Sequence, residues 1–170
     1  MTTDGAPDKA QTLDRLLGTV AEAMHSEVLL LDPDTPADVA ARRLERAGVS
    51  GAPVVRHGRA VGVVTLRDLF TAVGHDVAAH TSGPFLRHED ELARYRVGEL
   101  MTHGPTTVQS TWPLTSAVML MVDLGVNRLP VVDESGRAIG ILARDDILRR
   151  VATLTRQDSH QHRYPRLQPD

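Results

Sequence analysis

Thr65 and Asp68 stand at a spacing that suits the binding of a phosphorylated ribose. Thr65 ends an apolar run that predicts a strand, and a helix is expected from Leu66 onward. Backbone N–H groups at such a junction favour a phosphate, and the Thr65 hydroxyl adds a donor. The Asp68 carboxylate, one turn along, can accept both ribose hydroxyls. The pair equally fits a plain capping box that needs no ligand, so both interpretations stay open.

This region belongs to a unit that occurs twice in the chain. The segment VAEAM at residues 20–24 returns as VGELM at residues 97–101, and PVV at residues 53–55 returns as PVV at residues 130–132. Both pairs are displaced by 77 residues, and after one inserted residue GRAVGV at residues 58–63 returns as GRAIGI. A repeat of this length is a complete α/β unit. We therefore expect two stacked copies and seek function in the clefts between them.

The second copy departs from the first at its strand-to-helix junction. Ala143 replaces the hydroxyl residue there, although Asp146 remains. One hydrogen bond to a charged group is worth about 1.5–3 kcal/mol, or roughly ten- to a hundredfold in affinity. The second site should therefore bind more weakly than the first.

Each copy is predicted to run β-α-β-β-α, which gives an α/β protein with mixed sheets. In the first copy, Thr35 is expected as the N-cap of a helix that has Pro36 at its first position and is ended by Gly48. In the second copy, Gly125 ends the corresponding helix. The remaining expected elements are strands at 28–31, 52–56, 60–65, 106–108, 129–133 and 138–143, and helices at 113–124, from Leu66 and from Arg144.

The expected domain organisation follows from the repeat and from local composition. A disordered N-terminus covers residues 1–12, the first repeat residues 13–73, a polar connecting segment residues 74–96, the second repeat residues 97–155, and a flexible C-terminal tail residues 156–170.

The ordered set of motifs resembles a known family. APVV at residues 52–55, followed by GVVTLRD at residues 62–68, resembles the signature of the cystathionine-β-synthase (CBS) domain, and GILARDD at residues 140–146 repeats it. The resemblance implies a Bateman module, which is two CBS repeats packed as an intramolecular pseudo-twofold pair. Such modules bind AMP, ADP, ATP or S-adenosylmethionine between their repeats, and they usually regulate rather than catalyse.

Against a weaker second site, the resemblance implies a role for Arg128 of the second copy, two residues before Pro130. Related modules often place a phosphate-contacting cation at this position, where the first copy has Gly51. A solvated residue at a strand edge is the alternative for Arg128. Adenine selection would use backbone edges and small apolar side chains that equally describe ordinary core strands: Leu30, Ala52, Pro53, Val108, Leu129 and Pro130.

The first helices of the two copies differ in character. Met119, Leu120 and Val122 stand where the first copy has charged residues, and the segment 117–122 is apolar nearly all round. Such a helix must be buried on more than one face. We expect a homodimer through this helix. Burial by the connecting segment is the alternative.

Composition excludes several other classes of function. The chain has no cysteine, so it forms neither disulfides nor thiolate sites. A formal charge of −3 and 3% aromatic residues give nucleic acid little to bind. No apolar run approaches the roughly 20 residues of a membrane helix, and the start lacks the order of a secretory signal. We therefore expect a cytoplasmic protein that binds neither membranes nor nucleic acid.

The histidines raise the possibility of a metal site. His75, His80 and His88 lie in the connecting segment, and His160 and His162 in the tail, without the spacing of paired ligands. Solvated histidines are the favoured interpretation, and a metal sensor is a third-ranked one. No catalytic constellation stands out, so an enzyme is not expected. The sequence favours a sensor of an adenosyl ligand, with no obligatory cofactor, that signals to a separate protein; the alternative is a ligand-free dimeric scaffold with degenerate clefts.

Overall fold

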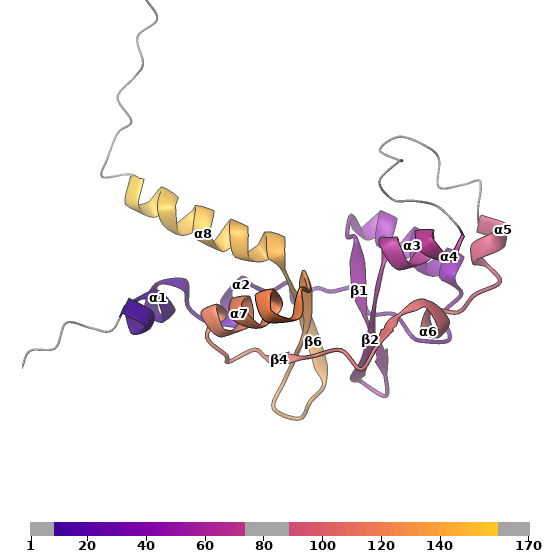
Figure 1. Ribbon diagram of the computed structural model, residues 1–170, viewed down its shortest axis with the longest axis horizontal. Coiled ribbons are helices and arrows are strands. Elements are labelled where there is room, and N and C mark those ends of the chain that lie inside the picture. Colours follow the sequence, from indigo (N-terminus) through magenta and orange to yellow (C-terminus); the bar gives the residue numbers. More distant parts are fainter. Residues whose placement is uncertain (1–8, 74–88, 160–170) are drawn as a thin grey trace, which may run out of the picture.

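Two three-stranded sheets lie next to each other in the middle of the computed structural model, which describes residues 9–73 and 89–159 (Figure 1). Strand β1 lies against β6 and β2 against β5, so the sheets face each other across the boundary between the repeats. The first sheet is antiparallel throughout, whereas β4 pairs parallel with β5 and β6 pairs antiparallel. The strands are β1 (Gly51–Arg56), β2 (Arg59–Thr65), β3 (Thr102–His103), β4 (Val108–Gln109), β5 (Arg128–Val132) and β6 (Ala138–Ala143).

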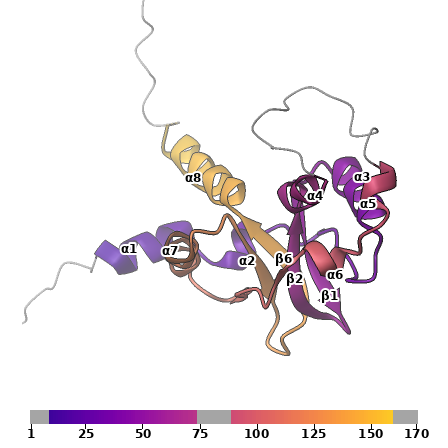
Figure 2. The same cartoon turned by 45° about the vertical axis from the view of Figure 1, so that its right-hand side comes forward.

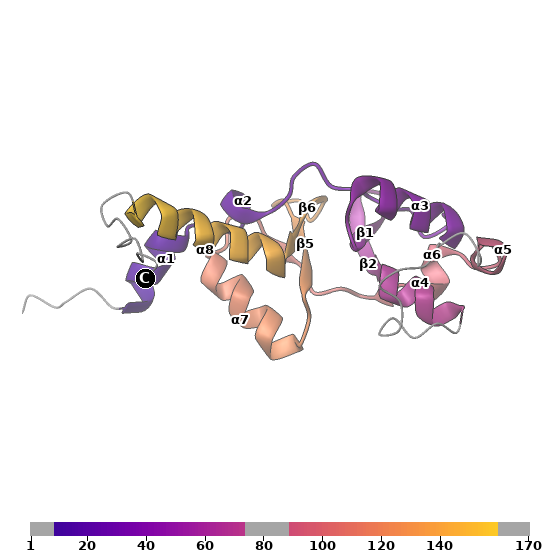
Figure 3. The ribbon, with the colours of Figure 1, turned by 90° about the horizontal axis from the view of Figure 1, so that it is seen from above.

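The helices gather at the two outer ends of the molecule, away from the boundary between the sheets (Figures 1 and 2). Seen from above, α7 and α8 run beside each other at one end, and α3 and α4 cover the other (Figure 3). The helices are α1 (Lys9–Leu17), α2 (Val20–Ala23), α3 (Ala37–Ala47), α4 (Leu66–Ala72), α5 (Glu89–Leu92), α6 (Val97–Leu100), α7 (Leu114–Leu124) and α8 (Arg144–Ser159). The predicted mixed α/β architecture is confirmed.

The two long first helices end as the sequence predicted. Gly48 after α3 and Gly125 after α7 both adopt φ 64°, the left-handed conformation that glycine takes without a steric penalty. Their beginnings differ from prediction by one residue. Pro36 is the N-cap of α3, and the helix starts at Ala37, because the Thr35 carbonyl accepts from Val97 N and Ala37 N donates to Tyr95 O. This pairing holds Thr35 and Pro36 outside the helix.

Two predicted strands were placed or extended wrongly. In the segment 28–31, only Leu31 pairs with β1, through a parallel bridge to Val54, and Leu30 is left exposed. A single bridged residue makes no strand. In the second repeat, β4 covers Val108–Gln109 rather than residues 106–108, because the parallel register with β5 begins at Val108.

Short helices from each half of the chain complete the core of the other half. Val20 of α2 is fully buried in the second core, with Leu114 and Leu142. Val97 of α6 and Leu92 of α5 are buried in the first core, with Leu31. Each core therefore contains residues from the other half of the sequence. The two repeats interlock rather than merely touch.

The ordered chain extends further than predicted at both ends. Helix α1 begins at Lys9, inside the segment 1–12 for which disorder was expected, because it packs against α7 and α8. Helix α8 continues to Ser159, beyond the expected start of the tail at residue 156. Residues 1–8, 74–88 and 160–170, with the predictions made for them, lie outside the described residues.

Over the described residues, none of the helices has both the length and the apolar character that a membrane span requires.

Candidate functional site

The junction between β2 and α4 forms a complete capping box. The Thr65 hydroxyl donates to Asp68 Oδ2 at 2.7 Å, and the Thr65 backbone N–H donates to the same oxygen at 2.8 Å. The Asp68 backbone N–H in turn donates to the Thr65 hydroxyl oxygen at 3.3 Å. Both side chains are half-buried. The expected pair is thus brought together, and it caps the helix by itself.

Arg128, at the start of β5, reaches from the second repeat toward this junction. Its guanidinium donates to the Ser50 hydroxyl, immediately before β1 of the first repeat. Burial lowers the pKa of Arg128, while the nearby Asp145 and Asp68 carboxylates act to raise it. An arginine keeps its charge at neutral pH, so a half-buried cation stands at the boundary between the repeats, within the electrostatic reach of Asp68.

The first repeat has no room for an equivalent of Arg128. Gly51 occupies the corresponding position and pairs with Thr65 across the sheet. A Cβ at Gly51 would lie 2.9 Å from the Val64 carbonyl oxygen and 3.0 Å from Cγ2 of Thr65. Only glycine fits there without a shift of the backbone. The two clefts therefore differ in charge as a consequence of packing.

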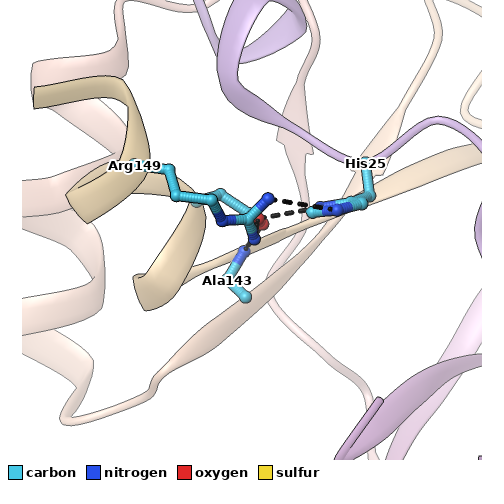
Figure 4. A network of polar contacts seen from close by, with 4 residues as sticks. His25, Ala143 and Arg149 are labelled. Atoms are coloured by element: carbon cyan, nitrogen blue, oxygen red, sulfur yellow. Dashed lines mark hydrogen bonds and ion pairs between the residues drawn. The ribbon is translucent and has the colours of Figure 1, made fainter. Parts of the chain in front are cut away.

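The second junction, between β6 and α8, has a different polar network (Figure 4). Asp146 Oδ2 accepts from the Ala143 backbone N–H at 2.7 Å, which repeats half of the first capping box. The other carboxylate oxygen is contacted by His25 Nδ1 at 2.8 Å and by the Arg149 guanidinium at 2.5 Å. The Asp146 side chain is 1% exposed. Asp146 was predicted from the sequence as a ligand residue, whereas His25 and Arg149 were not.

The residues proposed for adenine selection fall into two groups. Leu30 is 38% exposed at the surface. The others line the buried faces of the strands, where they form ordinary core: Ala52, Pro53, Val108, Leu129 and Pro130.

An apolar groove of about 460 Å³ lies between α7 and α8. Val122 and Leu148 line it and are 74% and 58% exposed, and Met119 on α7 is 64% exposed. Leu120 points the other way, because it packs against the second core. Of the three residues expected at a dimer interface, Met119 and Val122 thus lie on the surface and Leu120 does not.

A metal site can be sought only among the residues that the structure describes. Within residues 9–73 and 89–159, no three His, Asp or Glu side chains come together as a group that could hold a metal ion. His75, His80, His88, His160 and His162 lie outside the described residues.

Comparison with known proteins identifies the repeat. The family profile of the CBS domain matches residues 20–75 and 97–153. A CBS domain-containing protein of Dictyostelium discoideum is 34% identical over 135 residues, which cover 76% of this chain and 88% of that protein.

Two solved structures share the fold of the pair. CBSX2 from Arabidopsis thaliana, in complex with AMP, is 29% identical with a TM-score of 0.65, covering 81% of this chain and 98% of that one. The cytosolic domain of the Mg²⁺ channel MgtE, in complex with ATP, is 30% identical with a TM-score of 0.56, covering 74% of this chain and 46% of that one.

Proposed function

Because the chain belongs to the CBS domain family, we propose that it is a regulatory module that binds an adenosyl ligand between its repeats. The candidate ligands are AMP, ADP, ATP and S-adenosylmethionine, and none is an obligatory cofactor. Thr65 and Asp68 bind the ligand from the first repeat, and Arg128 binds it from the second. The proposed location is the cytoplasm, and the proposed activity is regulation rather than catalysis.

The position of Arg128 carries this proposal. It brings a half-buried positive charge from the second repeat to the Thr65–Asp68 junction of the first. A phosphate on Arg128 and a ribose on Asp68 would place one nucleotide in contact with both repeats. The adenine nucleotides in the CBSX2 and MgtE structures support the same ligand class.

The proposed mechanism is differential binding. A ligand held by both repeats stabilises the relative orientation in which Arg128 and Asp68 both reach it. A separate protein then reads that orientation. Ligand affinity and partner affinity must be linked by the same coupling free energy, whichever binds first.

Replacement of the junction residues tests the proposal. We expect Thr65→Ala and Asp68→Ala to remove most of the ligand-induced rise in melting temperature, because each deletes a polar partner worth about 1.5–3 kcal/mol. The loss of the cap lowers the ligand-free stability by about 0.5–2 kcal/mol, so each variant is compared with its own ligand-free melt. Thr71→Ala is the matched control, since Thr71 lies on α4 and its hydroxyl donates to Arg67 O within the same helix.

A second candidate function is an interaction scaffold with degenerate, empty clefts. The completeness of the Thr65–Asp68 capping box favours it, because the box explains both residues without a ligand. The scaffold predicts that both variants alter ligand-free stability alone and that no nucleotide shifts the melt of any protein.

We also propose that the module is a homodimer built on the α7–α8 groove. Val122 and Leu148 line the groove, and Met119 is a further exposed apolar residue on α7. A second copy of the same face covers such a surface in an isologous contact. At the positions of α3 that correspond to Met119 and Val122 the chain has Arg42 and Glu45 instead, so the two ends of the module differ in what they can bind.

A further inference from the structure

The Asp146 carboxylate is buried and is partnered on both oxygens. Its Oδ1 receives His25 Nδ1 at 2.8 Å and the Arg149 guanidinium at 2.5 Å, and its Oδ2 accepts from Ala143 N at 2.7 Å. His25 Nε2 lies 3.3 Å from the Arg149 guanidinium, so the two groups cover the carboxylate together (Figure 4).

The backbone fixes His25 over this carboxylate. His25 N donates to Ile141 O at 3.1 Å, and Ile141 N donates to His25 O at 3.2 Å, which ties the segment after α2 to β6. Gly140 permits this close approach, since a Cβ there would lie 2.7 Å from His25 O and 3.0 Å from Met24 Sδ. The main chain that carries His25 is therefore held by the fold, while the His25 and Arg149 side chains are 50% and 62% exposed on their outer sides.

The first repeat carries no such cover over Asp68. Thr102 takes the place of His25 at this junction. It pairs with Val63 on β2, as His25 pairs with Ile141 on β6. Thr71 on α4 stands where it has Arg149. Over the part of the chain that the structure describes, no Lys, Arg or His nitrogen forms an ion pair with Asp68 within 4 Å.

We propose that His25 and Arg149 close the second ribose position, so that each chain takes up one adenosyl ligand at Thr65, Asp68 and Arg128. The inference rests on the proposed function. A ribose that entered the second cleft would have to displace both His25 and Arg149 from Asp146, and so would break two charge-assisted contacts before it could donate its own hydroxyls to the carboxylate. The second cleft has Ala143 where the first has the hydroxyl of Thr65, and Gly51 where the first has the cation of Arg128.

Counting bound AMP by isothermal titration calorimetry tests the closure. We expect one AMP per wild-type chain. The triple variant His25→Thr/Ala143→Thr/Arg149→Thr places the first-repeat residues in the second cleft and should bind two. The opened site should be about ten- to a hundredfold weaker than the first, because Gly51 supplies no phosphate-binding cation.

Asp68→Asn serves as the control for site identity. Alone it should reduce the count from one AMP to none, and in the triple variant it should reduce the count from two to one. Two AMP on the wild type, or one on a folded triple variant, overturns the closure while the proposed function stands. If none of these proteins binds AMP, ADP, ATP or S-adenosylmethionine, the proposed function and the closure are overturned together.

A second measurement keeps the inference falsifiable if the triple variant does not fold. In wild-type protein with ¹⁵N-labelled histidines, the ring signals of His25 should be unchanged at saturating AMP, because its contact with Asp146 stays closed. Movement of those signals to the values of a free imidazole would show that a ligand displaces His25, and would contradict the closure.

Discussion

At the scale of single residues, the two repeats are alike in backbone and unlike in chemistry. Thr65 of the first repeat corresponds to Ala143 of the second, and Gly51 of the first corresponds to Arg128 of the second. The sequence showed both differences, because a displacement of 77 residues aligns Gly51 with Arg128 and, after one inserted residue, a displacement of 78 aligns Thr65 with Ala143. The contact of His25 with Asp146 could not be predicted, because the two residues are 121 positions apart in the sequence. The backbone pairing of His25 with Ile141, which brings them together, leaves no pattern in the local sequence.

Arg128 gives the sharpest prediction at this scale. We expect Arg128→Ala to weaken AMP binding by about ten- to a hundredfold, because one charge-assisted contact to the phosphate is lost. Adenosine, which has no phosphate, should lose much less affinity. Calorimetric titration of both ligands measures the difference, with Arg56→Ala, an exposed arginine paired with Asp34, as the control. An equal loss for AMP and adenosine would mean that Arg128 only holds the repeats together through Ser50.

At the scale of helices and strands, the amphipathic patterns predicted most elements to within a residue or two. Leu66 and Arg144 begin their helices as expected, and Ala138–Ala143 is a strand as expected. The errors fall where tertiary pairing sets the boundary. Proline is common at the first position of a helix, and both Pro36 and Pro113 were predicted there. Both are extended N-caps instead, because β-bridges hold Pro36 to Arg96 and Pro113 to Thr19.

The α7–α8 face supplies a prediction at the element scale. Val122→Asp should convert the proposed dimer to a monomer, because an unpaired charge buried in an apolar contact costs about 3–5 kcal/mol, more than a hundredfold in affinity. Glu45→Lys changes the equivalent position on α3 and should leave the assembly unaltered. Sedimentation velocity of the wild type and both variants is the measurement. A wild-type monomer at all concentrations, or a Val122→Asp protein that remains dimeric, would contradict the proposed interface.

At the scale of the whole molecule, the exchange of short helices makes the two repeats depend on each other. Val20 lies in the second core, and Leu92 and Val97 lie in the first. The sequence repeat predicted two stacked copies, residues 13–73 and 97–155, joined by a connecting segment. It could not reveal the exchange, because α2 and α6 carry the same motif and either could pack with either core.

Division of the chain tests this interdependence. A fragment of residues 9–73 lacks Val97, and a fragment of residues 89–159 lacks Val20, so each leaves an apolar hole in its own core. We expect neither fragment to show a cooperative melt alone, and an equimolar mixture to recover one. Circular dichroism reports the melts. A cooperative transition of either fragment by itself, near the melting temperature of the intact chain, would show that the repeats fold independently.

The most direct measurement is a thermal-shift titration of the intact chain with AMP, ADP, ATP and S-adenosylmethionine, each with and without a chelator. A saturable rise is expected for at least one ligand, equivalent to about 2.7 kcal/mol of stability at 100 times its Kd, and unaffected by the chelator. No shift for any of the four at millimolar concentration would contradict the sensor and leave the empty scaffold as the function of the pair.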